Sequence, residues 1–196
     1  MAIDPARLAL PRLPLELTEF NGMCVELADI VEADCVKNGT RFDLMGVLPR
    51  GSFAVADVMS RRLGFSALEI VSQSQTSYEH GKTVAGKRHF GQTITGQLVE
   101  GMDILVVDDT SDTDETLAQF KRIAFDLGAK SVKTAVIVYK PERNTTGQVP
   151  DYYLFEYNGW IDFPSEIHDA VGETSVACRA NILRREAARQ RAEAEA

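Results

Sequence analysis

Acidic and hydroxyl side chains crowd one short stretch near the middle of the chain, residues 108–116, which we call the acidic segment. Two acids would be enough to begin a loop and to cap a helix, because Asp caps helix N-termini well. A larger number indicates a site for a hard cation such as Mg²⁺, for the hydroxyls of a polyol, or for both. The acids of the segment are Asp108, Asp109, Asp112, Asp114 and Glu115.

The elements on either side would place this segment at the edge of a sheet. Residues 104–107 are a continuous apolar run, typical of a strand buried on both faces of a parallel sheet. Apolar residues then recur at the helical period from Leu117 to Leu127, and Gly128 is placed to cap that helix. Open α/β sheets bind ligands beyond the carboxyl ends of their strands, and helix N-termini attract phosphates. The pattern therefore predicts a phosphate-binding site at this strand end.

A second strand–turn–helix unit lies earlier in the chain. Residues 43–48 form a candidate buried strand, and Pro49-Arg50-Gly51-Ser52 turns the chain into a helix over residues 53–63. Gly51 permits a close backbone approach, Arg50 supplies positive charge, and the helix N-terminus adds N–H donors. The turn is a second, weaker indication of anion binding.

The remaining pattern completes an alternation of strands and helices. We expect an extended arm up to about Leu15, then a helix that Asn38-Gly39 ends, and strands over 67–72, 132–139 and 151–156. Lys140 falls directly after the 132–139 strand, at the same sheet edge as Asp108. The first helix should bury one face against the sheet, made of Phe20, Met23, Cys24, Leu27, Ile30 and Val31.

The polar stretch 73–97 has two interpretations. It could be a surface hairpin, or a mobile loop that closes over a site and excludes water during a reaction. Such a loop would bring a cationic or phenolic side chain to the ligand. The candidates are Tyr78, Lys82, Lys87 and Arg88, and the sequence does not choose among them.

Composition excludes several classes of protein. The chain has 196 residues and a net charge of −8, which argues against a general binder of nucleic acid or of anionic membranes. Cys24, Cys35 and Cys178 lack metal-ligand spacing and indicate thiols in a reducing compartment. We find neither a signal peptide nor a stretch that could span a bilayer, so we expect a cytoplasmic protein.

The acidic segment resembles the phosphoribosyl-diphosphate (PRPP) binding loop of the type I phosphoribosyltransferases. That loop consists of an apolar strand, two acids, two further residues and Asp-Thr-Gly-x-Thr, and here the last part reads Asp112-Thr113-Asp114-Glu115-Thr116. The 49–52 turn is similar to the diphosphate loop of the family. Lys140 resembles the lysine with which purine-specific members hold the 6-oxygen of the base. Residues 158–164 resemble the base-binding hood, although Ser165 replaces a second aromatic residue.

The resemblance implies a role for each matching residue. Asp108 and Asp109 would hold the ribose hydroxyls, with Asp109 close to Mg²⁺, and Arg50, Gly51 and Ser52 would hold the diphosphate. Asp112 would be the general acid/base near N7 of the base. Lys140, Trp160 and Ile161 would bind the base. The 5′-phosphate would lie against Asp112, Thr113, Asp114, Glu115 and Thr116.

The implied fold is a parallel α/β sheet flanked by helices, in a single domain with a small hood from the N- and C-terminal flanks. The core would span about 43–140, the hood about 1–40 and 150–170, and a helical tail about 171–196. The implied reaction joins PRPP and a purine base (hypoxanthine, guanine or xanthine) into a nucleoside 5′-monophosphate with release of diphosphate, as in purine salvage. Mg²⁺ is the implied cofactor, and family members suggest a homodimer or homotetramer.

Asp114 is the main departure from the family pattern, because it stands where the family has glycine. Asp tolerates left-handed backbone angles, so the shape of the loop can be kept. The charges of Asp114 and Glu115 would repel a phosphate, at about one to several kcal/mol for each pair, so we expect both side chains to point outward. An alternative function is therefore a non-catalytic nucleotide-sensing or regulatory relative. A phospho-receiver domain is excluded, because receivers carry their paired acids near the domain start.

Overall fold

The computed structural model describes residues 11–66, 69–72, 75–76, 78–79, 82–83, 89–90 and 96–164. Four expectations lie wholly or largely outside these residues: the role of the 73–97 stretch, the environment of Cys178, the substitution at Ser165 and the helical tail after residue 170. In the part that the model does describe, no helix combines the length and the apolar character that a membrane span requires.

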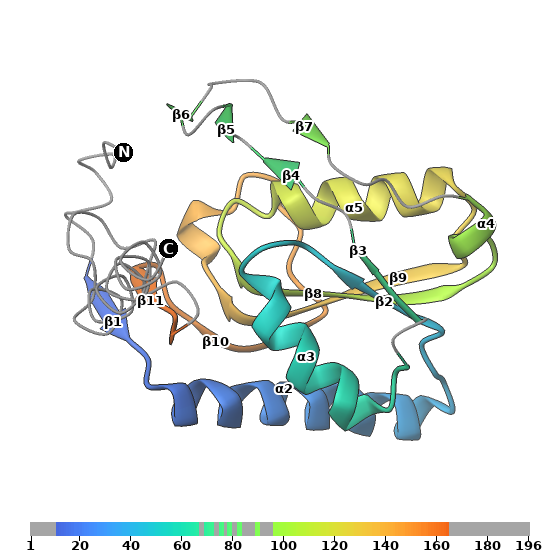
Figure 1. The fold of residues 1–196 in the computed structure, drawn as a ribbon, viewed down its shortest axis with the longest axis horizontal. Coiled ribbons are helices and arrows are strands. Elements are labelled where there is room, and N and C mark those ends of the chain that lie inside the picture. Colours follow the sequence, from blue (N-terminus) through green and yellow to red (C-terminus); the bar gives the residue numbers. More distant parts are fainter. Residues whose placement is uncertain are drawn as a thin grey trace, which may run out of the picture.

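A parallel five-stranded sheet forms the centre of the molecule (Figure 1). Its spatial order is β10-β9-β8-β2-β3. The chain begins this sheet with β2, adds β3 at one edge, and then crosses back to add β8, β9 and finally β10 at the other edge. Every neighbouring pair is parallel, as the continuous apolar runs predict. The strands are β2 (Leu44–Val47), β3 (Ile70–Ser72), β8 (Asp103–Ser111), β9 (Ser131–Tyr139) and β10 (Tyr152–Glu156).

Helices cover both faces of this sheet. The helices α2 (Leu17–Asn38) and α3 (Ser52–Leu63) lie on one face, and α5 (Glu115–Asp126) lies on the other (Figure 1). Alternate residues of β8 pack on opposite faces of the sheet, because successive side chains of a strand point to opposite faces. Leu105 and Val107 pack in the cluster with α2 and α3, whereas Ile104 and Val106 pack in the cluster with α5.

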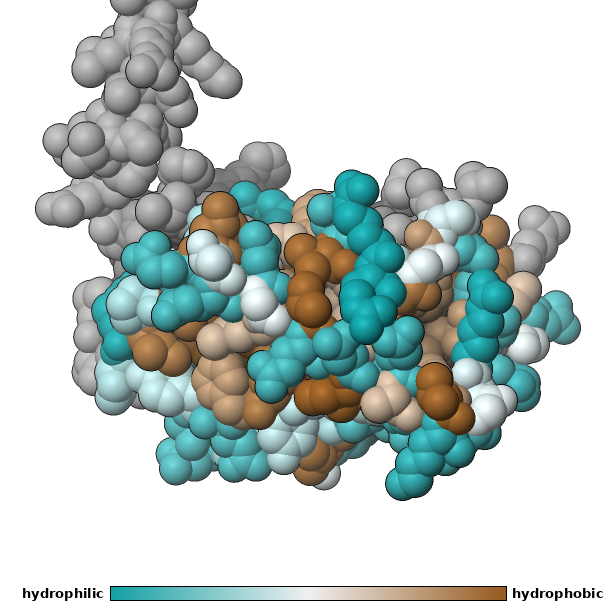
Figure 2. All heavy atoms as spheres, turned by 90° about the horizontal axis from the view of Figure 1, so that it is seen from below, coloured by the Kyte–Doolittle hydropathy of each residue, from teal (hydrophilic) through white to brown (hydrophobic). Residues whose placement is uncertain are grey.

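One residue that the sequence predicts on the buried face of α2 is exposed instead. Phe20, Cys24, Leu27 and Val31 are buried as expected, but Ile30 is 40% exposed. Other apolar side chains of the same helix are exposed too, and Figure 2 shows apolar patches scattered among polar ones on this side of the molecule. The helix ends at Asn38, and Gly39 caps it in the left-handed conformation with φ 61°, as the Asn-Gly pair predicts.

Strand β8 is longer than its apolar run. The sequence pattern ended the strand at Val107 and placed both following aspartates in a loop, and this boundary is wrong. The ladder with β9 continues as far as the pairing of Ser111 with Tyr139. Hydrogen bonding to a long neighbouring strand thus overrides the poor strand preference of Asp. Asp108 and Asp109 are consequently held by a sheet rather than by a loop.

Short elements complete the described part. The segments on either side of the core meet where β1 (Arg12–Pro14) pairs in parallel with β11 (Trp160–Asp162), and Arg12 forms an ion pair with Asp162. These strands belong to the flanks from which we expect the hood, and the rest of that region lies outside the described residues. The others are β4 (Gln75–Thr76), β5 (Tyr78–Glu79), β6 (Lys82–Thr83), β7 (His89–Phe90), α4 (Gly96–Val99) and the 3₁₀ turn Pro141–Arg143.

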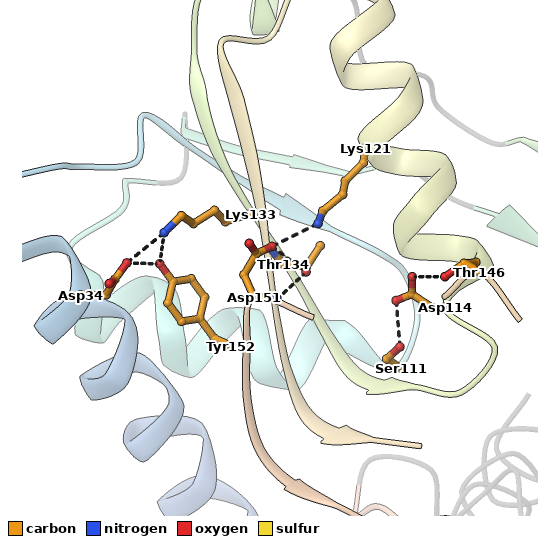
Figure 3. Close-up of polar contacts among 9 residues, drawn as sticks. All are labelled: Asp34, Ser111, Asp114, Lys121, Lys133, Thr134, Thr146, Asp151 and Tyr152. Carbon is orange, nitrogen blue, oxygen red and sulfur yellow. Dashed lines mark hydrogen bonds and ion pairs between the residues drawn. The ribbon is translucent and has the colours of Figure 1, made fainter. Parts of the chain in front are cut away.

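A polar cluster joins α2 to the amino ends of β9 and β10 (Figure 3). Lys133 Nζ and the Tyr152 hydroxyl each donate to Asp34 Oδ2, at 2.9 and 2.6 Å. The hydrogen bond from Tyr152, followed by that from Lys133, holds the pKa of Asp34 below its ordinary value of 3.8. Burial raises the pKa of Tyr152 to about 12. The cluster lies at the end of the sheet opposite the acidic segment.

Gly46→Ala tests the packing between β2 and α5. A Cβ at Gly46 would lie 2.7 Å from the ring of Phe120, which is fully buried. Overpacking of this kind costs roughly 1–3 kcal/mol, so urea unfolding should show a loss of that size. Gly22→Ala, on an exposed position of α2 with open space around it, is the control and should be neutral or stabilising. Equal stability of the two variants would contradict the packing argument.

Asp34→Asn tests the polar cluster through pH. A carboxyl group with a lowered pKa stabilises the fold above its unfolded-state pKa, and this contribution is lost as the pH falls through the lowered value. The variant should therefore have a lower Tm than the wild type at pH 7, and the difference should shrink as the pH falls below about 3.8. Asp57→Asn, which removes an exposed pair with Arg61, is the control and should change Tm little at pH 7.

Candidate active site

The turn after β2 contacts the carboxyl end of β8. A Cβ built at Gly51 would lie 2.1 Å from Asp109 Oδ2, so only glycine leaves room for this carboxylate. The Pro49–Arg50 peptide bond is cis, and Arg50 is exposed. Ser52 is buried and its hydroxyl donates to the Leu48 carbonyl. The 49–52 turn and the acidic segment, the two segments predicted to bind the ligand, are therefore in contact. The Ser52 hydroxyl already makes a hydrogen bond within the protein.

The paired aspartates at the end of β8 have different surroundings. The backbone N–H of Asp109 donates to Asp108 Oδ1 at 2.9 Å, which fixes the first carboxylate along the backbone. The Asp109 carboxylate is enclosed by the 49–52 turn, and burial raises its pKa to about 6 against the lesser opposing effects of hydrogen bonds and of the Lys140 charge. Nearby positive charge or a cation would favour the ionised form of this group.

Asp114 adopts the left-handed conformation that the family glycine would provide, with φ 64° and ψ −1°. Its side chain does not point outward to solvent, which corrects the sequence expectation. It is only 6% exposed, and its two oxygens accept hydrogen bonds from Ser111 Oγ and Thr146 Oγ1, both at 2.9 Å (Figure 3). A buried carboxylate requires such partners, and two neighbouring hydroxyls supply them.

The rest of the acidic segment forms the entrance to α5. Thr113 is half-buried and its carbonyl accepts a hydrogen bond from the Thr145 backbone N–H at 3.1 Å. Glu115 and Thr116 are half-buried residues of the first turn of α5. The first N–H groups of an α-helix have no intrahelical acceptor, so the start of α5 presents donors to an anion, as the sequence predicts.

Asp112 lies between two cationic side chains. Arg143 Nε donates to Asp112 Oδ1, and Lys140 Nζ lies 3.8 Å from Asp112 Oδ2. Arg143 is not among the residues predicted from the sequence, because it stands in a polar turn that resembles an ordinary surface turn. Its position three residues after Lys140 was the available signal, since Lys140 was already placed at that sheet edge.

Lys140, which follows β9, and Trp160, the first residue of β11, come together. Lys140 is 4% exposed, and its Nζ lies 5.7 Å from the centroid of the Trp160 ring. Ile161 is different, because its side chain is buried in the core cluster that contains α2 and α3. Of the three residues predicted to bind a base, Lys140 and Trp160 therefore lie together, and the Ile161 side chain does not join them.

The site offers few ligands to a metal ion. Among the described residues, no group of three or more His, Cys, Asp or Glu side chains is arranged to hold one. Mg²⁺ often binds through one or two carboxylates and completes its shell with water and substrate phosphates. The enclosed Asp109 carboxylate beside Asp108 fits a cation bound in that way.

Comparison with known proteins agrees with this geometry. A model of the phosphoribosyl transferase domain matches residues 26–170. A purine phosphoribosyltransferase from Pyrococcus horikoshii is 25% identical, with 83% of this chain and 99% of that chain covered and a TM-score of 0.65. A xanthine-guanine-hypoxanthine phosphoribosyltransferase from Helicobacter pylori is 20% identical, with 78% and 92% covered and a TM-score of 0.63.

A hypoxanthine-guanine phosphoribosyltransferase from Bacillus anthracis is 24% identical over 70% of this chain and 76% of its own, with a TM-score of 0.55. No match was found among curated protein sequences. The domain match covers most of the chain and includes both turns predicted to bind anions, the Lys140 strand end and the Trp160 strand. The chain belongs to the type I phosphoribosyltransferase family.

Proposed function

We propose that the chain is a Mg²⁺-dependent phosphoribosyltransferase that joins PRPP to a 6-oxopurine base and releases diphosphate. The observation that carries this proposal is the convergence of Lys140 on two predicted base-site groups. Its amino group lies 3.8 Å from the carboxylate of Asp112 and 5.7 Å from the centroid of the Trp160 ring. A cation for the 6-oxygen, an acid/base for N7 and a ring for stacking thus share one place.

The roles of the other residues follow from their positions. Donors of the 49–52 turn and the Arg50 guanidinium would bind the diphosphate, with the backbone N–H of Ser52 replacing its committed hydroxyl. Asp108 and Asp109 would accept hydrogen bonds from the ribose hydroxyls. The start of α5, with Thr113 and Thr116, would hold the 5′-phosphate. Bound Mg²⁺ would neutralise charge on the diphosphate as it leaves, and Asp109 is the residue that would hold it.

The chemistry needs a proton acceptor and a dry site. The base attacks the anomeric carbon of the ribose while the bond to diphosphate breaks, and positive charge develops on the sugar as in glycoside chemistry. The proton released by the base would pass to Asp112. Arg143 and Lys140 hold this carboxylate on both oxygens, so that its position is fixed before the base arrives.

Release of diphosphate tests the activity. Wild-type protein with PRPP and Mg²⁺ should turn over at least one of hypoxanthine, guanine and xanthine, and adenine should react less. Asp112→Asn should lower kcat by about 10²- to 10⁴-fold, because it removes the general acid/base. Asp126→Asn, on the exposed end of α5, is the control and should keep the wild-type rate.

Binding measurements distinguish the alternative function. A nucleotide-sensing relative would bind a purine nucleotide in calorimetry and would release no diphosphate with any of the four bases. Turnover with adenine alone would also contradict the proposal, since Lys140 is matched to a 6-oxygen acceptor rather than to an amino group.

Gly51→Ala tests the contact between the 49–52 turn and Asp109. The new methyl group would displace the Asp109 carboxylate, whose Oδ2 lies 2.1 Å from the built Cβ position. Displacements of this size cost on the order of 10²-fold in catalysis, and we expect such a loss in kcat/KM for PRPP. The Mg²⁺ concentration that gives half-maximal rate should rise as well. Gly22→Ala is the control, and an unchanged Mg²⁺ dependence in Gly51→Ala would contradict the assignment of Asp109.

A further inference from the structure

The 140–148 segment, which follows β9, lies against the acidic segment along several residues. At one end, the backbone N–H of Lys140 donates to the Ser111 carbonyl at 3.0 Å. Farther on, the N–H and the hydroxyl of Thr145 both donate to the Thr113 carbonyl at 3.1 Å. Backbone contacts thus join the two segments at both ends of the contact, and side chains occupy the space between.

The turn within the 140–148 segment presents one hydroxyl in a fixed orientation. Asn144 Oδ1 accepts from the backbone N–H groups of Thr146 and Gly147 at 2.9 and 2.8 Å, which closes the turn on its own side chain. The Thr146 hydroxyl accepts from the Gln148 N–H at 3.1 Å. Of the two acceptors in reach of its single proton, Asp114 Oδ2 at 2.9 Å is closer than Asn144 Oδ1 at 3.3 Å. Asp114 is therefore the partner for which this hydroxyl is oriented.

Asp114 connects this turn to the end of β8. One carboxylate oxygen takes the Thr146 hydroxyl and the other takes the buried Ser111 hydroxyl (Figure 3). The residue itself is the N-cap of α5 in a left-handed conformation that favours glycine, so a side chain here is retained against a backbone preference. A glycine would leave the buried Ser111 hydroxyl without this acceptor, and it would leave the half-buried Thr146 hydroxyl only its longer contact with Asn144 Oδ1.

We propose that Asp114 is a positioning residue of the phosphate site, which holds the 140–148 segment against the acidic segment through Thr146 and Ser111. Its negative charge is taken up by these hydroxyls and is turned away from the first N–H groups of α5. Because Lys140 and Arg143 belong to the segment that it holds, the groups for the base and for the 5′-phosphate keep a fixed spacing. This inference rests on the proposed function.

An effect of the Asp114 charge alone would change PRPP binding in the opposite direction. If Asp114 merely repelled phosphate, both Asp114→Gly and Asp114→Asn would improve PRPP binding. If it positions the loop, Asp114→Gly should raise the KM for PRPP by about tenfold with a smaller change in kcat. Asp114→Asn should stay within about threefold of wild type, because its amide accepts from Ser111 and donates to the Thr146 hydroxyl.

A double-mutant cycle locates the effect in the contact with Thr146. Thr146→Val should raise the KM for PRPP as Asp114→Gly does, and the double variant should be no worse than Asp114→Gly alone. Thr40→Val, at an exposed position after α2, and Asp126→Gly, at the exposed end of α5, are the matched controls. Additive effects of the two site variants would overturn the proposal, and so would a lower KM in Asp114→Gly.

Amide hydrogen exchange gives a readout that needs no turnover. Exchange of the 111–116 amides should be faster in Asp114→Gly and Thr146→Val than in wild type and Asp114→Asn, because the first two variants release the 140–148 segment. Failure of the wild type to release diphosphate with any base would contradict the proposed function only. Unchanged exchange in Asp114→Gly would overturn the positioning role, whether or not the wild type is active.

Discussion

The parallel ladder between β8 and β9 is the constraint on which the rest of the site depends. The two strands pair over their full length, from Asp103 with Ser131 to Ser111 with Tyr139. Because parallel strands end at the same edge, this pairing places the acidic segment beside Lys140 and the turn that follows it. The neighbouring pairing of β2 with β8 adds the 49–52 turn on the other side. Three strand ends thus supply the candidate site apart from Trp160, which lies on β11, and open parallel sheets place their sites at such an edge.

Three cationic side chains lie at the candidate site, although the chain as a whole is acidic. The protein carries a net charge of −8, and its proposed substrate is a polyanion. Arg50 follows β2, Lys140 and Arg143 follow β9, and α5 begins after β8, which lies between these two strands. Two of the acids nearby have close partners: Asp112 lies between the two cations, and Asp114 accepts from two hydroxyls. The proposed site would therefore rely on local donors for a phosphate rather than on a basic surface.

The sequence predicted the elements well because hydrophobic period and capping residues are local signals. The helix ending at Gly39 and the strand before Lys140 are confirmed. The predicted end of β8 was wrong, because its last residues adopt strand structure only through their pairing with β9. Ile30 matched the helical period of the buried face and is nevertheless 40% exposed, since the covered width of α2 depends on its neighbours. Arg143 and Thr146 were missed because their partners lie about thirty residues earlier in the chain.

The exchange of a glycine for Asp114 has a consequence for how relatives of this chain are recognised. A motif that demands glycine at this place would pass over the chain, although the backbone there keeps the left-handed turn. The substitution can be understood only together with Ser111, at the end of β8, and Thr146, in the 140–148 segment. A sequence signature for such members should therefore be written as a linked set of three positions. Either a glycine or an aspartate with two hydroxyl partners would then be compatible with the same left-handed turn.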